Sequence, residues 1–261
     1  MCLILIAHQM TEQIPLLVIA NRDEFYNRPT AAAERWDDRP ELVAGRDLVS
    51  GGTWFGACGS RWASVTNIRE GIRDKEHHSS KSRGWLVRDY LMNGMAPVDF
   101  LASIKPEEGE FAGYNLLLGD GEELWSSSNR EGQTKALAPG VYGLSNHLLD
   151  TPWPKVLRGK EGFKRLLEKT DFSHEEAFAL LADTTRATDA ELPETGIPLE
   201  WERALSAIFI TMPEYGTRCS TLLQVDADGR RFFTERRFTG GPQRWEESRF
   251  SWSADGSLLD R

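Results

Sequence analysis

The sequence contains few cysteines, and none of them form a pair with redox or metal-binding spacing. Of its 261 residues only Cys2, Cys58 and Cys219 carry a thiol, and no Cys-x-x-Cys occurs. Secreted domains that depend on disulfides contain more cysteines, usually in even numbers. The cysteine content therefore excludes a disulfide scaffold and fits a reducing compartment.

Long apolar runs are also absent. The first run, Leu3 to Ala7, is shorter than the apolar region of a signal peptide, has no basic segment before it and is followed by polar sequence. No stretch approaches the roughly 20 apolar residues that a membrane-spanning helix needs. We therefore expect a cytoplasmic protein without a transmembrane segment.

Positive charge is scarce as well. The chain has 31 Lys and Arg against 40 Asp and Glu, a net charge of −9. Binding to a phosphate backbone depends on clustered cations, so we expect no nucleic-acid partner.

The motifs of several common enzyme classes are missing. The sequence has no Gly-x-x-x-x-Gly-Lys-Ser/Thr loop, no Gly-x-Gly-x-x-Gly turn after a strand and no Gly-x-Ser-x-Gly elbow. None of its 5 histidines form a His-x-x-x-His pair, so no built-in metal site is expected.

What is present is the composition of a globular protein. Hydrophobic residues make up 40% and aromatic residues 10%, which is enough for a packed core. No Gly/Ser/Pro linker divides the chain, so we expect a single domain over residues 1–261.

Two apolar runs near the amino terminus predict a hairpin. Leu3–Ala7 and Leu16–Ala20 are continuous rather than alternating, as in strands covered on both faces. If the centres of the runs face each other, the numbers of paired residues sum to about 23, give or take a couple of residues, and Cys2 lies opposite Asn21. The charged sequence NRDEF would then lie beside the chain's amino terminus.

The rest of the chain predicts antiparallel strands and grouped helices. SGGTWFGAC and RWASVTN form a candidate second hairpin. Further strands are expected over 114–118, 123–127, 140–145, 207–212, 221–225 and 231–238, and helices over 82–92, 98–104, 154–168 and 174–183, the last capped by Ser173. This order predicts an α+β fold, a four-layer αββα sandwich of two stacked antiparallel sheets. The acidic segment 189–202 is either a lid or a surface excursion.

Cys2 is the strongest candidate for a chemical role. An initiator methionine is normally removed before a small residue, so the mature chain would begin with a thiol and a free α-amine. The pKa of an α-amine is about 8, so near neutral pH it can accept the thiol proton. Cys2 could thus be nucleophile and base together, or it is only a small apolar strand residue.

Polar residues at strand edges suggest partners for such a nucleophile. Attack on an amide or thioester carbonyl needs donors for the oxyanion and a cation near the thiolate. Asn67 ends one predicted strand, Asn146 ends another, and Arg218 precedes a third. Each also has an ordinary structural explanation, because Asn commonly caps a strand and Arg commonly forms surface ion pairs.

Arg22 and Asp23 are adjacent, so on an extended backbone their side chains point to opposite faces. We assign Arg22 to the thiol side, and Asp23 to the amine or to the backbone of the following loop. Alternatively, Asp23 begins a turn and Arg22 forms an ordinary ion pair.

Several long motifs in order resemble the NRDE family, whose eukaryotic members are called transport and Golgi organisation proteins. The resemblance covers Met1 to about Phe238 and rests on an opening Met-Cys and on ANRDEFYNRPT, AGRDLVSGGTWFGA, ASVTN, SRGWLVRDYL, YGLSNHLLDTPWPK and YGTRCSTLLQVDADGRRFFTERRF.

The resemblance implies the αββα fold of the N-terminal nucleophile hydrolases and a likeness to the choloylglycine hydrolase and penicillin V acylase group. By that analogy Cys2 matches the nucleophile, Arg22 the arginine after the second strand, Asn67 and Asn146 the two asparagines of the oxyanion or amine, and Arg218 the late arginine. The position of the acidic residue departs from the pattern of those acylases. It lies three residues beyond the arginine in those acylases, whereas Asp23 is adjacent here.

Two functions from different classes follow. The first is a cysteine N-terminal nucleophile amidohydrolase or thioesterase, which needs no cofactor and acts on a small acyl substrate. The second is a carrier that binds haem or an acyl lipid among Trp54, Trp62 and neighbouring aromatics, as the family's links to haem trafficking and acyl-lipid handling imply. Haem would need an axial ligand, for which Cys2, His8 and His147 are candidates. Protein partners are left open.

Overall fold

Two antiparallel sheets form the centre of the computed structural model, which describes residues 2–70, 80–169, 171–253 and 257. The first sheet contains, in spatial order, β10 (Gly140–Leu144), β1 (Cys2–His8), β2 (Leu16–Phe25), β11 (Tyr215–Val225), β12 (Arg231–Phe238) and β13 (Trp245–Trp252). The second contains, in spatial order, β3 (Thr30–Trp36), β4 (Arg39–Asp47), β5 (Phe55–Cys58), β6 (Arg61–Asn67), β7 (Tyr114–Gly119), β8 (Leu124–Ser128) and β9 (Gln133–Ala136).

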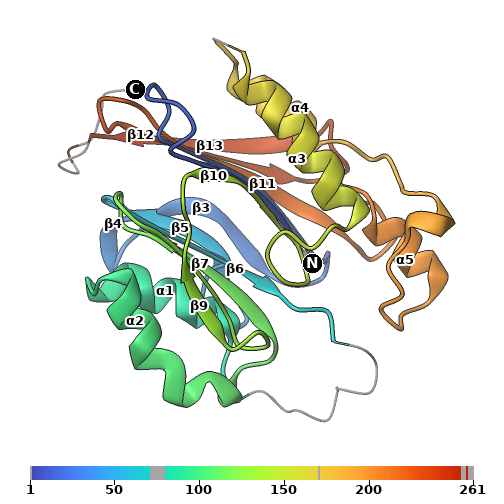
Figure 1. The fold of residues 1–261 in the computed structure, drawn as a ribbon, viewed down its shortest axis with the longest axis horizontal. Coiled ribbons are helices and arrows are strands. Elements are labelled where there is room, and N and C mark those ends of the chain that lie inside the picture. The colour runs from blue at the N-terminus through green and yellow to red at the C-terminus, as the bar shows by residue number, and fades with distance from the viewer. Residues whose placement is uncertain (1, 71–79, 170, 254–256, 258–261) are drawn as a thin grey trace.

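Helices cover the outer face of each sheet (Figure 1). The second sheet packs against α1 (Arg83–Asn93) and α2 (Pro97–Ile104), which is followed by the 3-10 turn η2 (Lys105–Glu110). The first sheet packs against α3 (Pro154–Leu167) and α4 (His174–Leu181), while η3 (Asp189–Glu191) and α5 (Leu199–Leu205) lie at one end. The predicted α+β sandwich of two stacked antiparallel sheets is confirmed.

Three apolar layers hold the sandwich together, and strand patterning explains them. Because successive side chains of β1 alternate, Ile4 and Ile6 lie in the layer between the sheets while Leu3 and Leu5 lie beneath α3 and α4. This is why β1 has a continuous apolar sequence: both of its faces are buried.

The register of the first hairpin differs by one from the central expectation and lies within the stated range. Cys2 pairs with Arg22, and Leu3 pairs with Asn21, so paired numbers sum to 24. Cys2 therefore does not lie opposite Asn21. The expected second hairpin is confirmed as β5 and β6, and Ser173 caps α4 through a capping box with Glu176.

The strand expected over 207–212 is wrong. This apolar segment follows α5 as an irregular buried connection, apart from an isolated bridge at Thr211. Some of its backbone groups form hydrogen bonds with side chains instead of in a strand ladder. The side-chain amide of Asn21 donates to the Ile208 carbonyl, and the backbone amide of Ile210 donates to the Thr217 hydroxyl. An apolar run alone does not distinguish a strand from such a connection.

Candidate active site

The hairpin of β1 and β2 places a thiol and a guanidinium next to each other. Cys2 and Arg22 are paired, so their side chains leave the sheet on the same face, toward the second sheet. The Arg22 guanidinium lies 4.1 Å from the centre of the Trp54 ring, and the side chain is only 7% exposed. Arg22 thus lies on the thiol side, where it was placed from the sequence, and its effect on the thiol stays a prediction.

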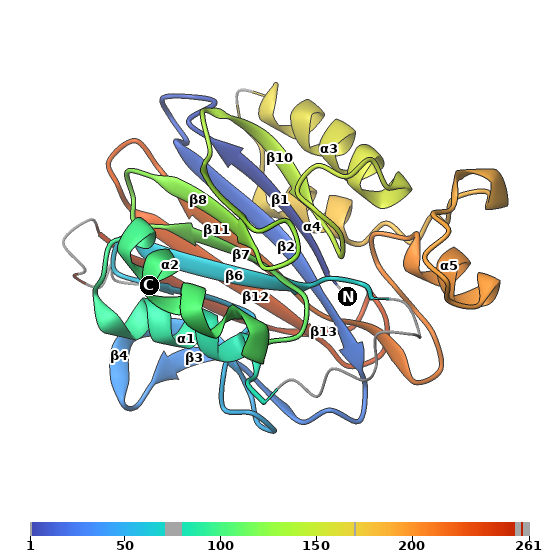
Figure 2. The ribbon, with the colours of Figure 1, turned by 60° about the horizontal axis from the view of Figure 1, so that its bottom comes forward.

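Asn146 fixes the backbone of Cys2. The Cys2 nitrogen donates to Asn146 Oδ1 at 3.0 Å, and Asn146 Nδ2 donates to the Asn67 carbonyl at 2.8 Å. The Ser145 hydroxyl also donates to the Cys2 carbonyl at 2.8 Å. Asn146 thus bridges the start of β1 and the end of β6, which lie side by side in both overall views (Figure 2).

Asp23 lies on the opposite face, as its position next to Arg22 predicts. Thr217 donates to Asp23 Oδ1 at 2.6 Å, and the ammonium of Lys155, from the first turn of α3, lies 3.9 Å from Oδ2. Both side chains are almost fully buried. Burial raises the pKa of the Asp23 carboxyl, against the opposing effect of Lys155, and burial lowers the pKa of Lys155.

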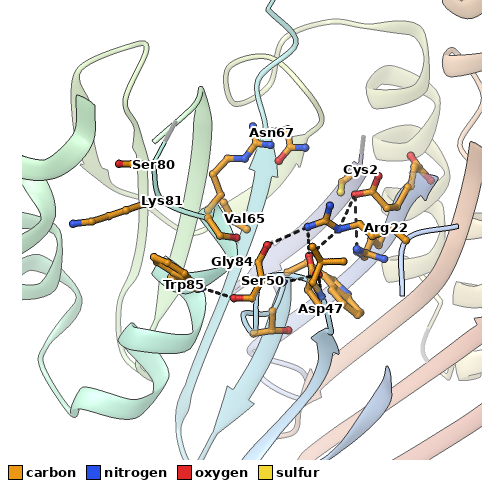
Figure 3. A pocket seen from close by; sticks show the side chains of 18 residues that line it. Cys2, Arg22, Asp47, Ser50, Val65, Asn67, Ser80, Lys81, Gly84 and Trp85 are labelled. Atoms are coloured by element: carbon orange, nitrogen blue, oxygen red, sulfur yellow. Dashed lines mark hydrogen bonds and ion pairs between the residues drawn. The ribbon is translucent and has the colours of Figure 1, made fainter. Parts of the chain in front are cut away.

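A cavity of about 520 Å³ opens beside Cys2. Figure 3 shows Cys2 and Arg22 on one side of it and Lys81 and Trp85 on the other. Its lining is mainly polar and includes Asn67. The charged residues in the lining are Arg22, Glu24, Arg28, Asp47, Lys81 and Arg83. Asp23 also borders the cavity, but its carboxyl is directed to the other face of the sheet, toward Thr217 and Lys155.

Two glycines allow the walls of this cavity to approach each other. The Thr53 amide donates to the Gly84 carbonyl at 3.1 Å, so the loop after β4 touches the first turn of α1. A Cβ on Gly52 would lie 2.5 Å from the Gly84 carbonyl carbon, which is too close for any side chain. The motifs SGGTW and SRGW are therefore a structural requirement for this contact.

Asn146 contacts the Cys2 nitrogen but is not among the described residues that line the cavity, and three other residues proposed from the sequence lie away from it. Arg218 donates to the carbonyls of Phe25 at 2.7 Å and Arg28 at 3.1 Å, and so fastens the loop after β2. His8 ends β1, about 20 Å from Cys2 at the usual rise of a strand. His147 is exposed, with Nδ1 2.9 Å from the Thr151 hydroxyl. None of the three are among the described residues that line the cavity.

His8 predicts a pH dependence of stability. It is 8% exposed, and burial lowers its pKa below 6.5, so the folded state binds a proton less tightly than the unfolded state. The free energy of unfolding should therefore fall as pH drops from 6.5 through the folded-state pKa. In urea unfolding curves, His8→Gln should flatten this fall, whereas His147→Gln, at an exposed site, should leave it unchanged. An equal slope in His8→Gln would contradict the prediction.

Sequence reasoning missed several charged residues of the site. Arg28, Asp47 and Arg83 lie in motifs that carried the family resemblance, but nothing in their spacing showed that they share a cavity. Lys155 lay in an expected amphipathic helix, where a lysine is ordinarily exposed. Its burial beside Asp23 depends on tertiary packing. The segment 189–202, considered as a lid, is also not among the described residues lining the cavity.

The part of the chain that the structure describes has neither a metal site nor a membrane-spanning helix. No group of three or more His, Cys, Asp or Glu residues there is arranged to hold a metal ion. None of the helices described has the length and apolar character needed to cross a bilayer.

The sequence of the whole region that builds this site matches a known family. Residues 1–240 match the family described as Transport and Golgi organisation 2. The chain belongs to this family. It is similar to the Transport and Golgi organization protein 2 homolog of Bos taurus, at 36% identity over 88% of this chain and 90% of that protein.

The chain is also similar over most of its length to other members of the Transport and Golgi organisation 2 family. The human homolog is 34% identical over 85% of this chain and 86% of that protein, and the Drosophila melanogaster protein is 24% identical over 86% and 87%. The predicted family is thus confirmed. The names of these relatives refer to Golgi organisation, and the expected cytoplasmic location of this chain stays a prediction.

Proposed function

We propose that this protein is a cysteine N-terminal nucleophile hydrolase that cleaves an amide or thioester of an acyl substrate. The observation that carries the proposal is the environment of Cys2: its side chain lines a cavity, Arg22 is paired with it on the same face, and Asn146 binds its nitrogen. A cysteine with only a packing role would need none of these polar contacts.

The reaction requires removal of Met1, which converts the Cys2 nitrogen into an α-amine. The amine takes the thiol proton, and the thiolate attacks the acyl carbon to form a carbon–sulfur bond. The bond to the leaving nitrogen or sulfur then breaks, and the leaving group takes the proton from the α-ammonium. Water, deprotonated by the same amine, attacks the acyl-enzyme, releases the carboxylic acid and restores the thiol.

Other residues have roles that follow from their positions. Asn146, which accepts from the Cys2 nitrogen, would orient the amine toward the thiol. The Asn67 side chain lines the cavity and would donate to the oxyanion. Arg22 would stabilise the thiolate, and Asp23 would act from behind the strand through its charge. Arg218 would support the loop that carries Arg28.

Intact mass and acyl-enzyme trapping test this proposal. The purified protein should have lost Met1, and incubation with panels of acyl amides and acyl-CoA thioesters should add one acyl group to the peptide that begins at Cys2. A chain that retains Met1, or that shows no adduct and no turnover with any panel member, would overturn the proposal.

A carrier of haem or an acyl lipid in the same cavity is the alternative proposal. The expected aromatic pocket is only partly present at the cavity: Trp54 lines it, whereas Trp62 packs in the core between the sheets. The charged lining favours a polar or anionic ligand over a purely apolar one. An absorbance shift on haem addition, together with an absence of acyl-enzyme, would support the carrier.

A further inference from the structure

We propose that Arg22 and Arg83 form an anion-binding subsite beside the Cys2 sulfur, so that the substrate carries a carboxylate or phosphate close to its reacting acyl carbon. The inference names a substrate class and, as far as it concerns turnover, rests on the proposed function. It follows from an imbalance between the cations that line the cavity and the partners that the protein provides for them.

Arg22 has hydrogen-bonding capacity that the protein does not use. Its Nη1 is buried and has no hydrogen-bond partner among the described residues. The nearest carboxylate oxygen, from Glu24, lies 3.8 Å from Nη2, beyond the normal length of a hydrogen bond. A buried guanidinium donor without a partner is costly, and this cost is recovered if a ligand oxygen occupies the site.

Arg83 is the second cation with unused donors. It begins α1 and lines the same cavity, and its one hydrogen bond within the described part of the chain goes from Nη1 to the Gly113 carbonyl at 3.1 Å. Burial lowers the pKa of Arg83, and the charges of Glu70 and of the Cys2 thiolate oppose this effect. An arginine stays protonated near neutral pH despite such a shift, so Arg83 remains a cation that acts on the thiol's surroundings.

The other two cations in the lining are already neutralised. Arg28 binds Asp47 at 2.7 Å, and Lys81 binds Glu107 at 2.6 Å and Glu110 at 3.3 Å. Arg22 and Arg83 are therefore the two cations of the lining that have no carboxylate of the described residues within hydrogen-bond distance, although Glu24 lies 3.8 Å from Arg22. In a protein with a net charge of −9, such a cavity would attract an anion that the rest of the surface repels.

Alkylation of Cys2 by two reagents of the same size but different charge tests the subsite. Iodoacetate carries a carboxylate one bond from its reacting carbon, and iodoacetamide is its neutral counterpart. We compare the rate ratio of the two reagents, measured by mass at the peptide containing Cys2, with the same ratio for the free thiol of N-acetylcysteine amide, which has no charged group besides the thiolate. At one pH the thiolate fraction cancels in this ratio, because both reagents attack the same thiolate.

The wild-type ratio should exceed that of the free thiol about 10-fold, the lower end of electrostatic enhancements in charged clefts. Arg83→Gln and Arg22→Gln should each return the ratio toward the free-thiol value, while Arg165→Gln, on the exposed face of α3, should leave it raised. A wild-type ratio equal to that of the free thiol, or a raised ratio that both cavity variants retain, would overturn the subsite. Arg83→Gln alone decides the matter if Arg22→Gln does not fold.

Competition identifies the anion, and the design separates this inference from the proposed function. Protection of Cys2 from iodoacetate by inorganic phosphate but not by succinate indicates a phosphate subsite, and the reverse indicates a carboxylate subsite. If neither anion protects Cys2 and alkylation shows no charge selectivity, both the phosphate subsite and the carboxylate subsite are ruled out. Alkylation needs an accessible thiol and no turnover. Charge-selective alkylation without any acyl-enzyme would therefore refute the hydrolase proposal and support the subsite. An acyl-enzyme without charge-selective alkylation would support the hydrolase proposal and refute the subsite.

Discussion

Replacing Cys2 with alanine is expected to abolish the acyl-enzyme and to lower the turnover of an acyl substrate by about 10⁴-fold or more, the usual effect of removing a nucleophile. The alanine chain keeps the α-amine, Arg22 and Asn146, so any remaining rate measures what binding and the oxyanion donors do without covalent catalysis. The measurement is kcat/KM together with the mass of the quenched protein.

The serine variant separates nucleophilicity from position. Cys2→Ser keeps a hydroxyl at the same place but replaces a strong nucleophile with a weak one, so it should form the acyl-enzyme far more slowly than wild type. Cys58→Ala is the matched control, because Cys58 is a buried thiol of β5 whose pKa is raised by burial. If Cys58→Ala lowers turnover as much as Cys2→Ala, or Cys2→Ala keeps wild-type turnover, Cys2 is not the nucleophile.

The parts of the site that sequence predicted are those that depend on local strand geometry. Two apolar runs separated by a short polar loop predict a hairpin, but the face that Arg22 takes depends on the register. The observed pairing of Cys2 with Arg22, one residue from the expected pairing with Asn21, is what puts Arg22 beside Cys2. The alternation of a strand then sends Asp23 to the other face. Asn146 could be proposed because it ends a predicted strand, whereas the pairing of that strand with β1, which brings Asn146 to Cys2, is seen only in the structure.

The parts that sequence missed depend on contacts between distant segments. Lys155 reaches Asp23 from a helix that follows β10, and Arg83 enters the cavity from a helix of the other sheet's outer layer. Neither position has a local signal, because a lysine or arginine at the start of an amphipathic helix is ordinarily solvated. The edge strands β3, β9 and β13 were missed for a related reason: their exposed positions carry polar or charged residues that weaken the apolar pattern. The strand β4, which pairs with β3, was missed as well.

The buried contact between Asp23 and Lys155 predicts the largest change in stability. Lys155→Met keeps most of the side-chain volume but removes the ammonium, and the Asp23 carboxylate then stays buried without this cation. Removing one partner of a buried ion pair costs about 3–5 kcal/mol, which we expect in the free energy of unfolding from denaturant curves. Lys164→Met, at an exposed position of the same helix, should change it by less than about 1 kcal/mol.

The pH dependence of this cost distinguishes charge from packing. Without Lys155, burial raises the folded-state pKa of Asp23 further above its ordinary value of 3.8, so the folded state binds the proton more tightly than the unfolded state. Stability of Lys155→Met should then fall as pH rises from 3.8 through that folded-state pKa, and its deficit relative to wild type should be larger at about pH 8 than at about pH 5. Adding Asp23→Asn should recover part of the loss, because the uncompensated carboxylate at this contact is then removed. A deficit independent of pH, unrelieved by Asp23→Asn, would mean that Lys155 contributes only its aliphatic chain, and Asp23 would then have no electrostatic partner in α3 with which to act on the amino end of Cys2.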